Sequence, residues 1–260
     1  MTYLSVNVNK VATLRNTRNI GIPSVTRLAR IALDAGAHGI TIHPRPDERH
    51  IRRGDVVELA ELLATYTDRE LNIEGNPFHG LVEHCRAAKP QQATLVPDEV
   101  SAATSDHGWP LGSMTRAQKI ELGRVIESLQ QVDCRVSLFV DPDPAVMPEA
   151  KALGAQRVEL YTEPYARAFA AGEADQELAR YRRAADAALR EGLELNAGHD
   201  LNLLNLGPFL AVIPEVVEVS IGHALVADAL EFGMAETVRR YLAICAGVRA
   251  DSGGKGSSTA

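Results

Sequence analysis

Hydrophobic and polar positions along the chain alternate between two kinds of segment. Short apolar runs rich in β-branched residues are typical of buried strands. Between them lie stretches with helical periodicity, such as VTRLARIALDAGA at 25–37, PEAKALGA at 148–155 and LARYRRAADAALREG at 178–192. Eight strand candidates occur, at residues 4–8, 39–43, 71–74, 93–96, 135–140, 157–161, 193–197 and 217–221. The pattern predicts one strand–helix unit repeated along the whole chain.

The number of repeated units predicts the fold class. Three of the expected helices end near Gly36, Gly154 or Gly192, where a left-handed C-cap is expected just before the next strand. Eight parallel strands with covering helices in about 250 residues favour a (β/α)8 TIM barrel. An open doubly wound sheet is disfavoured because GxGxxG is missing after the first strand. We expect a single barrel domain over residues 1–249 and a disordered Gly/Ser-rich tail over 250–260.

Composition excludes several classes of function. The chain has 260 residues, with 34 acidic against 27 basic side chains and a net charge of -7, which disfavours a general nucleic-acid binder. Its start lacks a signal-peptide pattern and no apolar run approaches the roughly 20 residues of a membrane span. We expect a soluble, cytoplasmic protein. Cys85, Cys134 and Cys245 show no CxxC spacing and are interpreted as buried thiols.

The ends of the expected strands carry the candidate chemistry, because a barrel enzyme has its active site at the C-terminal ends of its strands. The second strand ends at His43 and is followed by charged residues up to His50. The other strand ends supply Asn7, Asn9, Lys10, Glu74, Asp141, Glu159, His199, Asp200, Gly222 and His223. Three histidines converging with two glutamates indicate repeated general acid–base transfer more than hydrogen bonding at the rim.

The strand-end residues also allow two other kinds of chemistry, metal binding and Schiff-base formation. His43, Glu74, His199 and His223 offer nitrogen and oxygen ligands, but no HxH or HExxH spacing supports a metal site. We therefore expect metal-free proton transfer. A Schiff-base mechanism would depend on Lys10, which alone among the lysines falls near a strand C-terminus. Lys10 is better interpreted as structural or anion-binding, because we expect it in a loop.

Several features indicate an anionic substrate. Arginines cluster in the first two strand-end loops, where forked donors can grip phosphate or carboxylate: Arg15, Arg18, Arg45 and Arg49. The motifs NAGHD and SIGHAL place glycines after the seventh and eighth strands, where barrel enzymes often bind phosphate through backbone N–H groups. The long loop at 96–115 predicts a mobile lid, with a merely flexible surface loop as the alternative.

Seven motifs, in order over roughly residues 4–245, resemble the pyridoxine 5′-phosphate synthases of the deoxyxylulose-dependent vitamin B6 pathway: VNVNKVATLRNTR, GITIHPRPDERHIRRGDV, LNIEG, TLVPDE, RVELYTEPYA, LNAGHDLNLLNL and EVSIGHAL. The resemblance implies a (β/α)8 barrel, usually a homo-octamer. The implied reaction condenses 3-amino-2-oxopropyl phosphate with 1-deoxy-D-xylulose 5-phosphate to pyridoxine 5′-phosphate, phosphate and water. No cofactor is implied, because the amine of the substrate itself can form the imine.

The resemblance also implies residue roles. His43 and Glu74 would accept protons, His199 would donate one, and Glu159 would stabilise a charged transition state. Residues implied to hold the aminoketone phosphate are Asn7, Arg18, the backbone around His199 and Asp200, Gly222 and His223. Residues implied to hold the deoxyxylulose phosphate are Arg45, His50 and Thr104, the last on the expected lid.

The chain departs from the family pattern at two places. Many members carry Asp-His where this chain has Asn9 and Lys10, which leaves open how the deoxyxylulose chain is handled. Lys10 is still able to grip a phosphate or a hydroxyl. Many members carry Gly where this chain has Asp200. We expect its backbone N–H to remain available for phosphate, and its carboxylate to repel phosphate unless it is directed away.

Two other functions stay open at this point. A barrel aldolase or epimerase acting on a single sugar phosphate would share the anion-binding loops, and a Schiff-base aldolase would need Lys10. A non-catalytic sensor of phosphorylated metabolites would bind ligand without releasing phosphate. Such a sensor has no need of three histidines and two glutamates at the rim.

Overall fold

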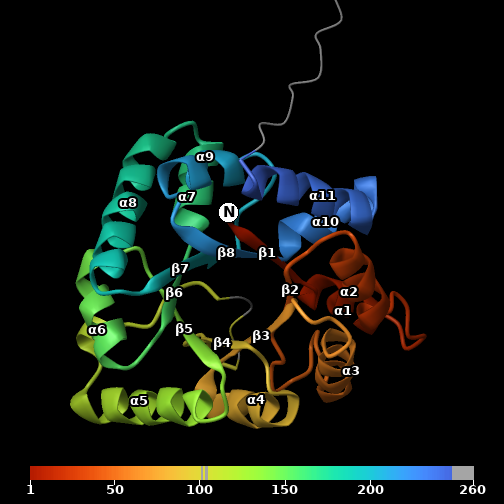
Figure 1. Cartoon of the computed structure of the whole chain (residues 1–260), viewed down its shortest axis with the longest axis horizontal. Helices are drawn as coiled ribbons and strands as arrows, with labels where there is room; N and C mark the ends of the chain where they lie inside the picture. The colour runs from red at the N-terminus through yellow and green to blue at the C-terminus, as the bar shows by residue number, and fades with distance from the viewer. Residues whose placement is uncertain (101, 103–104, 248–260) are drawn as a thin grey trace, which may run out of the picture.

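The computed structural model describes residues 1–100, 102 and 105–247. The expected tail at 250–260 and Thr104 lie outside the described residues. Eight parallel strands close into one barrel in chain order (Figure 1), which confirms the predicted fold. The strands are β1 (Tyr3–Asn7), β2 (Gly39–Ile42), β3 (Glu70–Gly75), β4 (Gln92–Leu95), β5 (Arg135–Val140), β6 (Arg157–Leu160), β7 (Glu194–Gly198) and β8 (Val216–Ile221).

Helices surround the ring of strands (Figure 1). Within the described residues these are α1 (Asn9–Asn16), α2 (Val25–Asp34), α3 (Arg53–Leu63), α4 (Val82–Ala88), α5 (Arg116–Gln130), α6 (Met147–Ala152), α7 (Glu163–Ala170), α8 (Ala174–Arg190), α9 (Leu206–Val212), α10 (His223–Phe232) and α11 (Met234–Cys245). Three of them, α1, α7 and α10, come directly after β1, β6 and β8 and are followed by a second helix. These three helices therefore begin at the C-terminal end of the barrel.

Local sequence signals explain several helix ends. The side chain of Ser24 accepts a hydrogen bond from the backbone N–H of Arg27 at 3.1 Å, and so caps the start of α2. The glycines that follow α2, α6 and α8 all adopt positive φ, at 108° for Gly36, 95° for Gly154 and 69° for Gly192. The predicted glycine caps are thereby confirmed.

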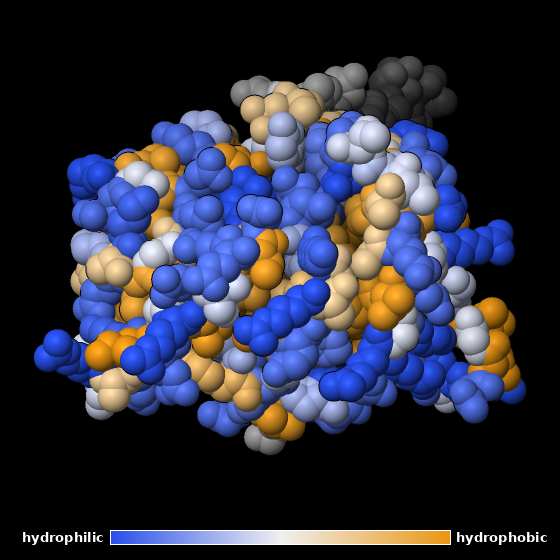
Figure 2. All heavy atoms as spheres, turned by 60° about the horizontal axis from the view of Figure 1, so that its bottom comes forward, coloured by the Kyte–Doolittle hydropathy of each residue, from blue (hydrophilic) through white to orange (hydrophobic). Residues whose placement is uncertain are grey.

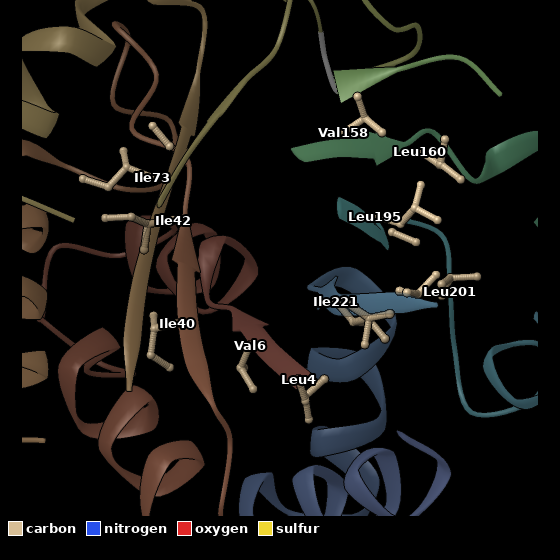
Figure 3. Close-up of a cluster of buried hydrophobic side chains, with 14 of the residues drawn as sticks. Leu4, Val6, Ile40, Ile42, Ile73, Val158, Leu160, Leu195, Leu201 and Ile221 are labelled. Atoms are coloured by element: carbon tan, nitrogen blue, oxygen red, sulfur yellow. The ribbon is translucent and has the colours of Figure 1, made fainter. Parts of the chain in front are cut away.

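The apolar core lies between the strands and the surrounding helices. Alternate residues of each strand carry the large apolar side chains. Figure 3 labels several of them, including Leu4 and Val6 on β1 and Ile40 and Ile42 on β2. These four side chains are fully buried. Burying each one stabilises the fold by roughly 1.5–3 kcal/mol relative to leaving it exposed. The apolar runs seen in the sequence thus pack the outside of the barrel wall.

Polar side chains take the other face of the strands and fill the barrel. The hydroxyls of Ser5 and Thr41 lie 2.6 Å apart, and Asn72 Nδ2 donates to Thr41 Oγ1 at 3.3 Å. Gln92 on β4 donates from Nε2 to Glu218 Oε1 on β8 at 3.0 Å. Because β4 and β8 stand on opposite sides of the closed ring, these two side chains meet in its interior. Barrel interiors are more often filled by Val, Ile and Leu.

The join between β7 and β8 is the tightest point of the wall. The register shifts between Leu195 and Asn196, which pair with Val216 and Glu218. A Cβ atom at Gly198 would lie 2.0 Å from the carbonyl oxygen of Ser220. Only glycine fits this position, immediately before His199 at the mouth of the barrel.

The outer surface is mainly hydrophilic on the face shown in Figure 2, where apolar residues are scattered among charged ones. Along residues 1–100, 102 and 105–247, no helix combines the length and the apolar character needed to cross a membrane.

We predict that Gly198→Ala lowers the free energy of unfolding by about 3 kcal/mol, because the added methyl group overlaps the backbone of β8. Denaturant unfolding monitored by circular dichroism measures the change. Gly54→Ala is the matched control, since Gly54 is exposed within α3 and has no atom within 4 Å of the added Cβ. Alanine there should gain about 0.5–1 kcal/mol. Equal stability of the two variants would contradict the tight join.

Candidate active site

A cavity of about 460 Å³ opens at the C-terminal ends of the strands. It gathers twelve of the fourteen site residues predicted from the sequence: Asn7, Asn9, Lys10, His43, Arg45, His50, Glu74, Glu159, His199, Asp200, Gly222 and His223. They come from six strand ends that are up to 216 positions apart in the chain, counting from Asn7 to His223. Barrel closure alone explains their meeting, since the carboxyl ends of parallel strands all face the same side.

The two remaining predicted residues are Thr104 and Arg18. Thr104 is outside the described residues. Arg18 follows the end of α1 and lies beside Leu14, Ile20 and Ile22 on an open surface away from the mouth. The eight residues of α1 advance the chain by about 12 Å, which carries Arg18 away from the strand end where β1 delivers Asn7.

Glu74 occupies the inner end of β3. Asn7 Nδ2 donates to Glu74 Oε2 at 3.4 Å, and the hydroxyl of Ser220 lies 3.5 Å from Oε1. Burial raises the pKa of Glu74 well above its ordinary value, and the negative charges of Glu159 and Asp98 raise it further. A carboxylate with a raised pKa is a stronger proton acceptor than a solvated one.

Glu159 faces Glu74 from β6 and is 4% exposed. No hydrogen-bond partner for its Oε2 occurs among the described residues. Its pKa is also raised, first by burial and then by the charge of Glu218 deeper in the barrel. Two buried carboxyl groups that repel each other's charge favour one proton held between them. The pair therefore offers a proton acceptor and a proton-carrying group in the same space.

His43 and His50 follow β2, the strand next to β3 that carries Glu74, and their ring centroids lie 5.9 Å apart. Burial lowers the pKa of both imidazoles, and the positive charge of Arg45 lowers it further, to about 4 for His50. The backbone N–H of Ile51 donates to His50 Nδ1 at 2.9 Å. A ring nitrogen that accepts a hydrogen bond carries no proton, so this bond requires the neutral form of His50. Both rings are uncharged at neutral pH, so His43 is able to accept a proton.

His199 has the opposite electrostatics. It follows β7 with φ of 36°, a left-handed conformation that is strained for a side chain of this size. Burial by itself lowers its pKa, but the hydrogen bond from its Nδ1 to Asp200 Oδ2 at 2.8 Å and the charges of Asp200 and Glu159 outweigh burial and raise the pKa. His199 is suited to donate a proton near neutrality, whereas His43 is suited to accept one.

Arg45 is tied to the long loop after β4. Its Nη2 forms a buried ion pair with the carboxylate of Asp98, and its Nη1 donates to the carbonyl of Ala102 at 2.9 Å. Arg49 Nη1 donates to the same carbonyl at 2.8 Å. Further along, Trp109 Nε1 donates to the carbonyl of Leu95 at 2.8 Å. The loop expected to form a lid is thus bonded to the residues that follow β2, and its motion stays a prediction.

The structure corrects two expectations about the backbone. Asn9 and Lys10 are not in a loop but form the first turn of α1, where Asn9 Oδ1 accepts a hydrogen bond from the N–H of His43 at 2.9 Å. The N–H of Asp200 is not available for phosphate either, because it donates to Thr162 Oγ1 at 3.2 Å. The N–H of His199 is likewise used, since it donates to the carbonyl of Ser220.

The loop after β8 keeps the geometry expected of an anion site. Gly222 precedes α10, and His223 is the first residue of that helix, so backbone N–H groups without helical partners face the mouth there. A Cβ atom at Gly222 would lie 3.1 Å from the side chain of Asn7. Glycine lets the start of α10 approach β1 closely enough to close the mouth on this side.

Sequence reasoning missed several residues of the cavity. Ser220, Phe139, Thr13, Val96 and Ser105 line it but were not predicted. Arg49, which the sequence places in the arginine cluster of the first two strand-end loops, also lines it. A signal for Ser220 was present: it lies two positions before Gly222 on β8, and the alternation of strand residues places both on the same face.

No group of three or more His, Cys, Asp or Glu side chains is arranged to hold a metal ion in the part of the chain that the structure describes. The cavity itself contains carboxyl groups, imidazoles, guanidinium groups and the N-terminus of α10. A closed barrel with carboxyl groups, imidazoles and guanidinium groups converging at its mouth defines the class: a (β/α)8 barrel whose cavity is suited to general acid–base catalysis.

Comparisons with known proteins identify the family within this class. The sequence model of the family described as "Pyridoxal phosphate biosynthesis protein PdxJ" matches residues 4–247. A pyridoxine 5′-phosphate synthase from Albidiferax ferrireducens is 54% identical over 93% of this chain and 96% of its own length. One from Chelativorans sp. is 52% identical over 93% of this chain and 98% of its own length. The chain belongs to the PdxJ family.

Solved structures share the fold at low sequence identity. Phosphoribosyl anthranilate isomerase from Thermus thermophilus superposes with a TM-score of 0.57 at 16% identity, over 95% of this chain and all of that chain. Tryptophan synthase from M. tuberculosis gives a TM-score of 0.61 at 11% identity, over 96% of this chain and 94% of that chain. At these identities the similarity supports the barrel and nothing about the reaction.

We predict that His50→Asn weakens the dependence of the free energy of unfolding on pH below pH 7. The folded pKa of His50 is about 4 against an ordinary value of 6.5, so the unfolded chain binds more protons between these pH values and stability falls as pH drops through that window. Removing the imidazole should reduce the loss of unfolding free energy between pH 7 and pH 4 by up to about 3 kcal/mol.

Denaturant titrations at several pH values measure this change. His107→Asn is the control, because the side chain of His107 is 54% exposed. The same pH dependence in His50→Asn and in the unsubstituted protein would show that His50 is not buried as a neutral ring.

Proposed function

We propose that this chain is a pyridoxine 5′-phosphate synthase that condenses 3-amino-2-oxopropyl phosphate with 1-deoxy-D-xylulose 5-phosphate. The products are pyridoxine 5′-phosphate, inorganic phosphate and water. Besides family membership, one observation supports the proposal. The cavity contains His43 and His199, whose pKa values are shifted in opposite directions, together with two buried carboxyl groups. A ring-forming condensation needs proton transfers in both directions on several sides of one intermediate.

The proposed mechanism assigns a direction of proton transfer to each group. The amine of the aminoketone attacks the carbonyl of the deoxyxylulose to form an imine with loss of water. Glu74 and the neutral His43 then remove protons from carbons next to the imine, and the resulting enamine loses one hydroxyl as water and the phosphate of the deoxyxylulose part. A water molecule adds at the carbon that the phosphate left. An enamine carbon then attacks the carbonyl carbon of the aminoketone part to close the ring, and that carbonyl oxygen leaves as water when the ring becomes aromatic. His199 donates protons to departing oxygen atoms. Glu159 stabilises positive charge that develops on nitrogen. No protein lysine is consumed.

Two anion sites are assigned to the two substrates. The start of α10, with Gly222, His223 and Asn7, is proposed to hold the phosphate of the aminoketone. Arg45 and His50, with Asn9 and Lys10 opposite, are proposed to hold the deoxyxylulose phosphate. Arg45 would exchange the carboxylate of Asp98 for the phosphate when this substrate enters.

The other functions receive less support. A Schiff-base aldolase would use Lys10, whose side chain is exposed at the start of α1 instead of projecting from a strand into the barrel. A non-catalytic sensor does not need two buried carboxyl groups with raised pKa values, whereas such groups are typical of catalytic sites. Borohydride trapping tests the aldolase, since a covalent adduct at Lys10 would replace the proposed mechanism.

We predict that Glu74→Gln reduces turnover by at least about a hundredfold, because the amide cannot accept a proton. Binding of each substrate, measured by calorimetry, should stay within a few fold. The reaction is followed by the mass and absorbance of pyridoxine 5′-phosphate after mixing both substrates with purified protein. Glu121→Gln on the exposed face of α5 is the control and should keep full activity.

Two results would contradict the assignment. Full turnover by Glu74→Gln would remove Glu74 from the mechanism. Absence of pyridoxine 5′-phosphate with folded, unsubstituted protein that binds both substrates would overturn the proposed function itself.

We further propose that the protein works in the cytoplasm as a homo-oligomer, with the octamer that the family resemblance implies. Its three cysteines are free, which suits a reducing compartment. Ile20 and Ile22 are 54% and 64% exposed next to Arg18. An exposed apolar surface of this kind is typical of a subunit contact. Since Arg18 does not reach the cavity of its own barrel, its proposed phosphate contact would be made in a neighbouring subunit.

We predict that mixed subunits restore activity. Arg18→Ala and Glu74→Gln should each be nearly inactive alone. After the subunits have been exchanged by denaturing and refolding them together in equal amounts, about a quarter of full activity should return. Random pairing gives half mixed pairs, and one of the two sites in each mixed pair is intact. No recovery in mixtures whose exchange is verified by mass would place Arg18 outside the neighbouring site.

A further inference from the structure

The residue after His199 contacts it directly at the mouth of the barrel. Asp200 Oδ2 lies 2.8 Å from His199 Nδ1, and the two side chains are 27% and 34% exposed. Both line the cavity that holds Glu74 and Glu159. Neighbouring residues in an extended chain point their side chains to opposite sides. The contact therefore requires a special backbone conformation, which the positive φ of His199 supplies.

Hydrogen bonds fix both the N–H and the carbonyl group of Asp200. Asp200 donates its N–H to Thr162 Oγ1 at 3.2 Å and accepts from Asn205 Nδ2 at 3.2 Å through its carbonyl oxygen. The hydroxyl of Thr162 in turn donates to the carbonyl of Gly198 at 2.6 Å. With its main chain anchored in this way, Asp200 has its carboxylate directed at the imidazole of His199. The strained conformation of His199 is held by the surrounding fold.

We propose that Asp200 is a positioning residue that orients the imidazole of His199 and fixes which of its nitrogens exchanges a proton with the substrate. When the carboxylate accepts a hydrogen bond from Nδ1–H, the proton on Nδ1 is held in place, and Nε2 is the nitrogen that exchanges a proton with the substrate. The inference rests on the proposed function, in which His199 is the proton donor. It goes beyond that function because it gives a task to a carboxylate that would otherwise only repel a phosphate.

Charge supports the same role. Among the described residues, the groups that act on His199 besides Asp200 include Glu159 on β6, Asp98 in the loop after β4 and His43 after β2, and the ring of Tyr161 has its centroid 6.4 Å away. Among the groups that raise the pKa of His199, Asp200 acts most strongly. The positive charge of the protonated ring offsets the charge of Asp200 in return. The mouth can then admit an anionic substrate despite the extra carboxylate.

The test compares Asp200→Asn with Asp200→Ala. Asparagine keeps an acceptor for Nδ1 but removes the charge, and alanine removes both. The pKa of His199 is followed directly by nitrogen-15 NMR of the imidazoles, with its signal assigned by its loss in His199→Gln. Asp186→Asn is the matched control, since Asp186 is a 47% exposed carboxylate on α8 that pairs with Arg182.

The expected NMR result is a fall in the pKa of His199 of about one pH unit in both variants of Asp200 and no change in Asp186→Asn. The signals should also show the neutral ring protonated at Nδ1 in Asp200→Asn and a mixture of the two neutral forms in Asp200→Ala. An unchanged His199 pKa in both folded variants would overturn the proposal, whatever reaction the protein catalyses.

Kinetics supplies the second measurement. In Asp200→Ala, kcat should fall about tenfold or more with little change in KM, and the alkaline limb of the kcat profile should move to lower pH, because His199 loses its proton earlier. Asp200→Asn should recover part of kcat at low pH. A fall in KM alone, with kcat and its pH profile unchanged, would show that Asp200 acts on substrate charge and not through His199.

Discussion

The structure depends on one constraint: a closed ring of eight strands forces every strand residue to face either the helices or the barrel interior. The outward positions are apolar, as Leu4 and Ile40 illustrate, and bury the wall against the helices. The inward positions are largely polar, and several of them pair across the ring, as Gln92 and Glu218 do. Because a buried polar group is costly unless it is hydrogen-bonded, these pairs hold the side chains of the interior in fixed positions. The active-site carboxyl groups stand on top of this network.

That arrangement explains how one cavity contains bases and acids at the same pH. Burial acts on all the titratable groups of the mouth, raising the pKa of carboxyl groups and lowering that of imidazoles. Neighbouring charges then decide the outcome. The positive charge of Arg45 lowers the pKa of His43 further, whereas the hydrogen bond to Asp200 and the charge of Asp200 raise the pKa of His199. The difference comes from which loop follows each strand, since the two histidines occupy equivalent places on β2 and β7.

Much of this was predictable from local sequence signals. The eight strands, the glycine caps at Gly36, Gly154 and Gly192, and the strand-end residues that meet in the cavity all follow from periodicity and chain order. Other features were not predictable. Asn9 and Lys10 have no strong helix signal, yet they begin α1 because Asn9 bonds to the backbone of His43 on the next strand. The N–H of Asp200 is used by Thr162, 38 positions away in the chain, and no local pattern indicates such a partner.

The sequence by itself determined the number and order of the strands and the alternation of strand and helix, because these depend on the spacing of apolar residues over a few turns or strand positions. It also determined which residues stand at the strand ends. Only the tertiary structure decided what those residues contact: that Arg45 pairs with Asp98, that Asp200 turns toward His199, and that Arg18 leaves the mouth. Hydrogen bonds and charge effects act over a few ångströms between segments far apart in the chain. Their partners are therefore settled by how the barrel closes.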